Sequence, residues 1–313
     1  MPSSGPAGGK PPRILVTGGA GFVGSNLVHR LVAAGADVSV VDNLLTGHPR
    51  NLPAGVALER MDCGSPEFAA WALGTKWDLA FHFAGASSAP LFDEQPARLS
   101  NAVAAFQNVL EAARASRCKV AFASTSSLYA RSPRPSREDM PIAPGTLYEA
   151  SKYAMEQVAC AYWHRYGVPS AAFRFFSVYG PREEAKGRFA NIVSQFLWSL
   201  RSGEAPVIYG DGSQTRDFTH VDDLLDAVQL ATERTQDFQV YNVGTGVETS
   251  FNDVVRLLND ALGTDIEPKH VPNPVANYVA ATQADAGKVR ALGWRPKVVL
   301  QDGIRRLAMA VPA

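Results

Sequence analysis

A run of closely spaced glycines near the amino terminus restricts the fold of this chain more than any other feature. The segment 17–24, TGGAGFVG, follows a compact apolar run at 13–17 and leads into a stretch with helical spacing at 22–34. Glycines at a strand-to-helix turn allow a tight bend and let a diphosphate approach backbone N–H groups. The positive end of the helix then stabilises the bound negative charge. The glycines that carry this spacing are Gly18, Gly19, Gly21 and Gly24.

The first half of the chain alternates short β-rich runs with stretches of helical spacing. Continuous apolar strands separated by helices are typical of parallel strands that are buried on both faces of a sheet. After the first strand, the expected strands are 37–42, 77–83, 119–124 and 170–176, and the clearest helices are 97–115 and 148–166. The pattern predicts an α/β fold, a Rossmann-like doubly wound parallel sheet, with a smaller carboxy-terminal mixed α/β domain for the substrate.

The regular alternation ends near residue 180. A charged loop at 182–186, a helix at 191–200 and a polar, glycine-containing loop at 210–217 are expected there. We expect a disordered tail over residues 1–12. A dinucleotide-binding domain over 13–180 and a mainly substrate-binding domain over 181–313 would follow it. Segments near 218–245 are expected to return to the first domain.

Composition narrows the classes of partner. The 313 residues include 30 Lys+Arg and 30 Asp+Glu, so the formal net charge is zero, which argues against nucleic acid or an anionic membrane as a partner. The chain has no apolar run of about 18 residues, and its start lacks the order of a signal peptide. Three cysteines without a Cys-x-x-Cys pair argue against disulfides and a zinc site. We therefore expect a cytoplasmic protein without a metal.

Asp42 closes the second expected strand, where an acidic side chain can accept hydrogen bonds from the adenosine ribose of a dinucleotide. A carboxylate at this place disfavours the 2′-phosphate of NADP, so the sequence favours NAD. His48 and Arg50 lie nearby and keep NADP open, because a cation could offset the repulsion. On its own, Asp42 could also be a turn residue at the end of a strand.

A tyrosine and a lysine open the helix expected at 148–166. Tyr148 and Lys152, in YEASK, lie on one helical face. Tyrosine, with a pKa near ~10, is a poor base at neutral pH, but an adjacent ammonium and a positive nicotinamide ring lower that pKa. Hydroxyl side chains at 124–127 follow a buried strand, where ligands of open α/β sheets bind. Taken singly, these motifs could be a surface pair and a loop cap.

Together these motifs resemble the extended short-chain dehydrogenase/reductase family, specifically its NAD-dependent nucleotide-sugar epimerases and dehydratases. The resemblance runs from about residue 13 to residue 308. The matching segments are VTGGAGFVGSNL, VVDNLLTG, FASTSSLY, YEASK, FRFFSVYGPRE, YGDGSQTRDFTHVDD and YNVGTG. The resemblance implies NAD as the cofactor, a nucleotide-diphosphate sugar as the substrate, and a homodimer formed through helices 97–115 and 148–166.

The resemblance also implies roles for single residues. Tyr148 would be the acid/base, Lys152 would lower its pKa and hold the nicotinamide ribose, and Thr125 would hydrogen-bond the reacting oxygen. Arg216 would grip the substrate diphosphate, which suits a fixed guanidinium. The implied substrate contacts are Thr125, Ser177, Asn191 and Arg216. The implied cofactor contacts are Gly18, Gly21, Phe22, Val23, Gly24, Asp42, Asn43, Asp62, Cys63, Phe83, Ala84, Gly85, Ser87, Tyr148 and Lys152.

The sequence departs from the family pattern in places. The dehydratases carry Thr-Asp-Glu at the hydroxyl motif, and the two acids perform elimination, whereas residues 125–127 here are Thr-Ser-Ser. The dehydratase interpretation is weaker for that reason. Ser177 stands where the family often has asparagine, which leaves one substrate contact open. Arg216 has the alternative of an internal pair with Asp217 or Asp222.

The activity that the resemblance implies is an epimerisation. Transient hydride removal gives a keto-sugar, and return of the hydride to the opposite face inverts the centre. Two positions stay open: C4 of a UDP-hexose, which needs one tyrosine, and C6 of an ADP-heptose. In the heptose enzymes a lysine is a second acid/base, and Lys186 falls at that position unless it is a solvent-facing loop lysine. UDP-glucuronate 4-epimerase is a third candidate, because of the hydroxyl at Ser177. A 4,6-dehydratase, a keto-sugar reductase and a non-catalytic NAD-binding protein are the alternatives.

Overall fold

A seven-stranded parallel sheet forms the centre of the computed structural model, which describes residues 10–273 and 279–310. The strand order is β11-β6-β5-β4-β1-β2-β3. These strands are β1 (Arg13–Thr17), β2 (Asp37–Val41), β3 (Leu58–Glu59), β4 (Leu79–His82), β5 (Lys119–Thr125), β6 (Ser170–Phe175) and β11 (Phe238–Val243). The doubly wound sheet expected from the alternating pattern is confirmed. The expected amino-terminal tail lies, up to residue 9, outside the described residues.

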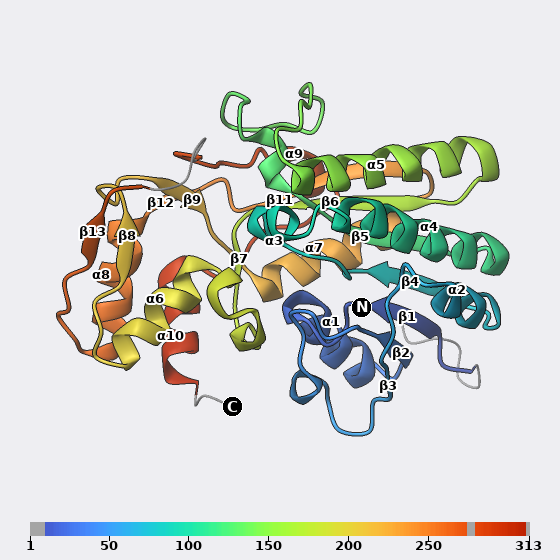
Figure 1. Ribbon diagram of the computed structural model, residues 1–313, viewed down its shortest axis with the longest axis horizontal. Coiled ribbons are helices and arrows are strands. Elements are labelled where there is room, and N and C mark those ends of the chain that lie inside the picture. The colour runs from blue at the N-terminus through green and yellow to red at the C-terminus, as the bar shows by residue number, and fades with distance from the viewer. Residues whose placement is uncertain (1–9, 274–278, 311–313) are drawn as a thin grey trace.

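Helices cover both faces of the sheet (Figure 1). Because successive strand residues point to opposite faces, Ile14 and Val16 pack into one core while Leu15 packs into the other. The first core is covered by α1 (Phe22–Ala33), α7 (Val221–Arg234) and α9 (Gly287–Ala291). The second is covered by α2 (Pro66–Leu73), α4 (Arg98–Ser116) and α5 (Leu147–Tyr166), with α3 (Ala89–Glu94) beside α5. This two-sided burial explains why the strands are apolar throughout.

The ends of α5 are set by local chemistry. The Thr146 hydroxyl accepts a hydrogen bond from the Glu149 N–H at 3.1 Å, which caps the amino terminus of the helix. Gly167 ends the helix in the left-handed region at φ 69°, where glycine carries no steric penalty. The Tyr–Lys pair therefore lies within the first turns of a well-defined helix.

A smaller part of the molecule lies beside the sheet (Figure 1). Its core joins α6 (Ile192–Arg201), α8 (Phe251–Leu262) and α10 (Leu300–Met309). Its short strands are β7 (Val178–Tyr179), β8 (Val207–Tyr209), β9 (Thr215–Asp217), β10 (Thr219–His220), β12 (Glu248–Ser250) and β13 (Lys269–Val271). Two expected loops differ. The charged segment runs into a 3-10 helix at Glu184–Phe189, and the polar loop ends in β9, because pairing with β12 orders residues that have no strand pattern of their own.

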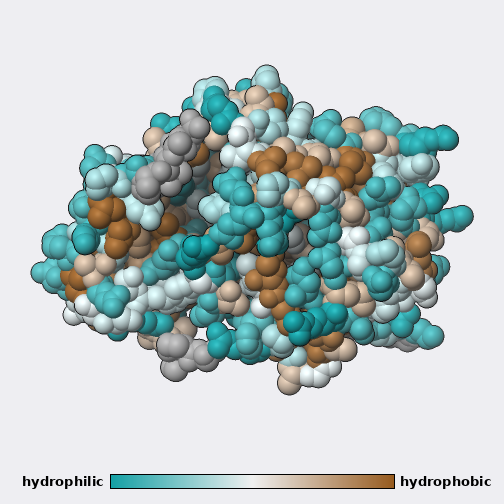
Figure 2. Space-filling view, viewed as in Figure 1, coloured by the Kyte–Doolittle hydropathy of each residue, from teal (hydrophilic) through white to brown (hydrophobic). Residues whose placement is uncertain are grey.

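The molecular surface is mixed in polarity. On the face shown in Figure 2, hydrophilic side chains predominate and apolar ones gather in separate patches, one of them where α5 lies in Figure 1. Within residues 10–273 and 279–310, none of the helices is long and apolar enough to cross a membrane.

Candidate active site

A cavity of about 690 Å³ opens at the carboxyl ends of the central strands. Its lining comes from the β1–α1 turn, the end of β5, the start of α5, segment 186–191 and Arg216 on β9. It adjoins a narrower cavity of about 100 Å³ that reaches Asp42, and the two share Gly18 and Gly21 in their linings. Together they can accommodate an elongated ligand that runs past the glycine turn.

The glycine turn is packed too tightly for side chains. A Cβ on Gly18 would lie 2.4 Å from the Ala84 nitrogen, and one on Gly24 would lie 2.1 Å from the Gly18 carbonyl oxygen. Gly18 also adopts φ 70°, in the left-handed region. Gly21 precedes the first helical residue, Phe22, and offers no side-chain cap. The free N–H groups of α1 therefore face a ligand-sized space, which fits a diphosphate.

Asp42 lies at the far end of the narrower cavity and is 6% exposed. Its Oδ1 accepts from the Leu44 N–H at 2.8 Å, and its Oδ2 accepts from the Ala20 N–H at 3.0 Å. Burial raises the pKa of the Asp42 carboxyl, and these backbone donors oppose that rise. Within the described part of the chain, neither His48 nor Arg50 lines the cavity. The cavity lining therefore includes the Asp42 carboxylate, which disfavours a 2′-phosphate, but neither of the side chains that kept NADP open, so the geometry favours NAD.

Asp62 is held beside Asp42 by a set of amide donors. Asn43 Nδ2 donates to it at 2.9 Å, and Asn101 Nδ2 donates at 3.2 Å. Asn101 and Arg98 from α4 line this cavity, and the sequence analysis missed both because α4 approaches only in the folded molecule. Cys63 lines the cavity and is buried, which raises its thiol pKa. The remaining expected cofactor residues also line one or both cavities: Phe22, Val23, Phe83, Ala84, Gly85 and Ser87.

Tyr148 is buried at the cavity wall rather than exposed on a helix surface. It is 8% exposed, and the ring of Phe92 lies 5.7 Å away, centroid to centroid. Burial raises the pKa of Tyr148, while a hydrogen bond with the Thr125 side chain lowers it. The Thr125 hydroxyl also contacts Ser127 Oγ at 3.2 Å. The fold thus brings the hydroxyls of Thr125, at the end of β5, and Tyr148, at the start of α5, next to each other, as the sequence predicts.

Lys152 lies one helical turn from Tyr148 and is also buried. Its Nζ donates to the Ala123 carbonyl at 3.0 Å, and burial lowers its pKa to about 8. The sequence analysis missed His82. Burial and the nearby Lys152 lower the pKa of His82 to about 3, so its imidazole is neutral at neutral pH and adds no second positive charge beside Lys152. A phenolate on Tyr148 and an ammonium on Lys152 would relieve each other's burial penalty.

A buried ion pair fixes α5 against the sheet one turn beyond Lys152. Arg174 of β6 and Glu156 of α5 are joined at 2.6 Å, with side chains 3% and 2% exposed. Ser124 Oγ donates to the same carboxylate at 2.5 Å, and Arg174 donates to the Tyr129 hydroxyl at 2.6 Å. The position of Tyr148 and Lys152 on α5 therefore depends on a buried network of polar groups that are hydrogen-bonded to one another.

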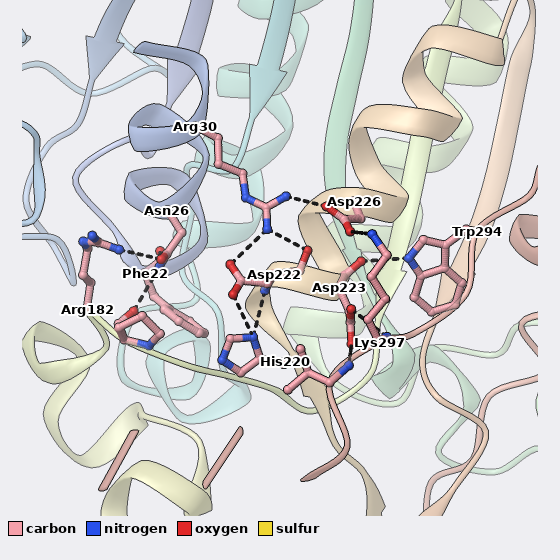
Figure 3. Close-up of polar contacts among 12 residues, drawn as sticks. Phe22, Asn26, Arg30, Arg182, His220, Asp222, Asp223, Asp226, Trp294 and Lys297 are labelled. Carbon is pink, nitrogen blue, oxygen red and sulfur yellow. Dashed lines mark hydrogen bonds and ion pairs between the residues drawn. The ribbon is translucent and has the colours of Figure 1, made fainter. Parts of the chain in front are cut away.

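Arg216 enters the cavity from β9 on the opposite side. It donates to the Thr215 carbonyl at 2.7 Å, and its guanidinium lies 5.3 Å from the centroid of the Phe251 ring. Asp217 faces away from the cavity, and its carboxylate accepts from Thr245, Gly246 and Ala284. Asp222 binds Arg30 instead, as Figure 3 shows. Neither aspartate named as an alternative partner accounts for the position of Arg216.

The remaining expected residues lie in the segment after β6. Ser177 adopts φ 33° and lines the cavity. Lys186 also lines it, which corrects the alternative of a solvent-facing lysine. Asn191 lines it as well, as the N-cap of α6, its side chain accepting from the Val193 N–H at 3.0 Å. Within the described residues, no group of three or more His, Cys, Asp or Glu side chains is placed to hold a metal ion.

The chain is similar to proteins that are named for reactions on nucleotide sugars. A UDP-glucose 4-epimerase of Mycolicibacterium smegmatis is 34% identical over 304 residues, covering 94% of this chain and 96% of that protein. The structure of UDP-glucose 4-epimerase from Thermotoga maritima with UDP-glucose matches with a TM-score of 0.90 at 32% identity, covering 95% and 97% of the two chains. The Thermus thermophilus UDP-glucose 4-epimerase in complex with NAD matches with a TM-score of 0.85 at 32% identity, with the same coverage.

Proteins with other reactions also match, among them UDP-glucuronic acid decarboxylases, a dTDP-glucose 4,6-dehydratase and an ADP-heptose 6-epimerase. The model of one family spans residues 14–244, which covers the glycine turn, the Tyr–Lys pair and Arg216. NAD is the cofactor of this family, and the residues described above fit it. The chain belongs to the NAD dependent epimerase/dehydratase family.

Proposed function

We propose that this protein is a redox-neutral epimerase that inverts C4 of a UDP-hexose. The observation that carries the proposal is the Thr125–Tyr148 pair, buried where the cofactor cavity meets the space that Arg216 lines. A sugar bound by its diphosphate at Arg216 would present a ring hydroxyl to Tyr148. The relatives named UDP-glucose 4-epimerase support this choice of carbon and nucleotide.

In this proposal the chain's own residues hold and move one proton. The Tyr148 phenolate oxygen takes the proton of the sugar hydroxyl as that carbon becomes a ketone. After the keto-sugar has turned its other face to the cofactor, Tyr148 returns the proton to the same sugar oxygen. Thr125 donates a hydrogen bond to the reacting oxygen, and Lys152 stabilises the phenolate. NAD, when bound, supplies the acceptor for the carbon-bound hydrogen and gives it back. Burial of Tyr148 and Lys152 excludes water from the exchange.

Elimination chemistry has less support at this site. The two side chains after Thr125 are hydroxyls, and Ser127 is already hydrogen-bonded to Thr125. Glu149 lines the cavity, but its carboxylate accepts from the Gly145 N–H at 2.7 Å and from Arg131 at 3.0 Å. A carboxylate held in this way is poorly placed to remove a proton from the sugar, so we rank epimerisation above the 4,6-dehydratase reaction.

The proposed assembly is a homodimer through α4 and α5. Both helices carry a buried face toward the sheet, and they also carry half-buried apolar residues that do not pack against that core: Val103, Ala104 and Ala154. Pairing of these outer faces between two copies would cover the apolar patch that Figure 2 shows near α5. Sedimentation of the purified protein would test this, with a monomer at micromolar concentration contradicting it.

The test of function is proton NMR of the purified protein, without added cofactor, on UDP-glucose, UDP-N-acetylglucosamine, UDP-glucuronate and ADP-heptose in turn. Conversion of a UDP-hexose to its C4 epimer is the expected result. Conversion of ADP-heptose alone would move the reaction to C6. A 4-keto-6-deoxy product would establish a dehydratase, and activity that requires added NADH would establish a reductase.

A further inference from the structure

One buried carboxylate organises the segment that brings Lys186 into the cavity. Glu183 is 1% exposed, and its Oε1 accepts from Lys186 Nζ at 2.8 Å and from the Asn191 N–H at 2.9 Å. Its Oε2 accepts from Ser194 Oγ at 2.7 Å. Two residues that line the cavity, Lys186 and Asn191, are therefore held by the same side chain.

The segment is also fastened to the cofactor-binding helix. Arg182 Nη1 donates to Asn26 Oδ1 at 2.6 Å, and Asn26 Nδ2 donates to the Phe22 and Pro181 carbonyls at 2.9 and 3.0 Å (Figure 3). The Lys186 ammonium lies 5.6 Å from the centroid of the Phe22 ring. Phe22 is the first residue of α1, so Lys186 lies beside the helix end that suits a bound diphosphate.

The charges at this place favour anion binding over proton exchange. Lys186 is 16% exposed on its side chain and has its positive charge balanced by Glu183. An acid/base would have to release and regain a proton at each turnover, and the buried carboxylate would then lose its charged partner. Of the three N–H groups of the ammonium, one donates to Glu183, and the others can donate to an anion in the cavity.

We propose that Glu183 is a positioning residue that holds Lys186 as a fixed cation for a diphosphate, and that Lys186 acts by its charge rather than as a second acid/base. The diphosphate belongs to the nucleotide sugar or to the dinucleotide. The inference rests on the proposed function in taking the substrate to be a nucleoside-diphosphate sugar. It assigns Lys186 a role different from the one that the heptose enzymes suggest.

Binding measurements on the NAD-containing protein test the charge directly. Lys186→Met is expected to weaken UDP and ADP binding, measured by calorimetry, about tenfold to a hundredfold, because one charge-assisted hydrogen bond is lost. Uridine and adenosine, which lack the diphosphate, are expected to bind as before. Lys186→Arg keeps the charge and should restore UDP binding to within about threefold of wild type.

The two diphosphates are distinguished by a second measurement. If the anion belongs to the cofactor, Lys186→Met loses NAD on dialysis while its affinity for UDP and ADP is unchanged. If it belongs to the substrate, NAD content is unchanged and UDP or ADP binding falls. Unchanged UDP and ADP binding together with unchanged NAD retention would overturn the proposal.

Glu183→Gln tests the positioning role, with Glu184→Gln as the matched control at an exposed neighbouring position. Glu183→Gln should weaken diphosphate binding in the wild-type background and have no further effect on Lys186→Met, as expected for coupled residues. If Glu183→Gln bound the diphosphate as tightly as wild type or more tightly, the carboxylate would only neutralise the charge of Lys186 and would not position it. If this variant does not fold, the comparison of Lys186→Met with Lys186→Arg still decides the role of the lysine.

Turnover of UDP-glucose separates this inference from the proposed function. Lys186→Met should raise KM about tenfold or more and leave kcat within about threefold, because a contact shared by substrate and transition state contributes uniform binding. Lys186→Arg should restore KM. A fall in kcat that arginine does not rescue would make Lys186 an acid/base and contradict the inference. If the wild-type protein does not turn over UDP-glucose, the proposed function fails, while the calorimetry still tests Lys186.

Discussion

The two sides of the cavity are built in different ways. The cofactor side consists of strand ends, a helix start and glycines that admit no side chain, with Asp42 buried directly after β2 and Lys152 buried on α5. The substrate side consists of a 3-10 segment, short strands and the strained residues Ser177 and Arg182, at φ 33° and 71°. Functional residues on irregular segments can vary without changing the sheet that supports them. We therefore expect changes on the cofactor side to stop the chemistry or destabilise the fold, and changes on the substrate side to alter affinity.

The largest expected effect is that of Tyr148→Phe. Removing the hydroxyl removes the proton carrier, so kcat should fall by about 10³-fold or more, the upper range for acid–base groups. NAD content should not change, because the glycine turn and Asp42 remain. Tyr153→Phe, at a half-buried position on the same helix outside the cavity lining, is the control. Turnover above a tenth of wild type in Tyr148→Phe would exclude Tyr148 as the acid/base.

Glu156→Gln and Glu183→Gln together compare how much the two sides of the cavity contribute to the free energy of unfolding. Arg174 would keep its charge inside the protein with a weaker partner, and removing one member of a buried ion pair costs about 3–5 kcal/mol. Glu183→Gln should cost less, because Lys186 is partly exposed and can turn to solvent. Guanidinium unfolding of both variants provides the measurement. An equal or larger loss in Glu183→Gln would show that the substrate side is as rigidly built as the cofactor side.

Asp42→Asn should weaken cofactor binding. Hydrogen bonds to a charged acceptor contribute about 1.5–3 kcal/mol each, so NAD should bind roughly tenfold to a hundredfold more weakly. NADP should gain relative to NAD, because the carboxylate no longer repels a 2′-phosphate. Titration of both dinucleotides into cofactor-free protein measures this, and an unchanged NAD/NADP ratio would exclude Asp42 from ribose recognition.

His82 predicts a pH dependence of stability. Its pKa in the folded protein is about 3, below the ordinary 6.5, so the unfolded chain binds more protons between these values. Stability is therefore retained above pH 6.5 and lost as the pH falls below it, by roughly 2 kcal/mol at pH 5. His82→Gln should remove this loss in unfolding measured at pH 7 and pH 5. His164→Gln, at an exposed position, is the control and should keep it.

The sequence predicts the cofactor side of the cavity better than the substrate side. Gly18 and Asp42 could be located because they sit at fixed offsets within a strand–turn–helix pattern, and Tyr148 and Lys152 because their spacing places both on one face at the start of an expected helix. The seventh strand, β11, was expected only as a return to the first domain, since its pairing partner lies more than sixty residues earlier in the chain.

Other residues could not be predicted because their roles exist only after folding. Asn101 reaches Asp62 from α4, and His82 becomes significant through its burial near Lys152. Glu183 reads as one acid in a charged run, REEAK, and nothing in that run distinguishes it from the exposed Glu184. Burial, which separates the two, depends on α6 packing over the segment.

The central claim, inversion of C4 without net oxidation, is tested most directly with UDP-glucose that carries deuterium at C4. The account predicts that the purified protein, without added cofactor, forms the C4 epimer with the deuterium retained at C4. Loss of the label to water, or a product that is not the C4 epimer, would contradict it.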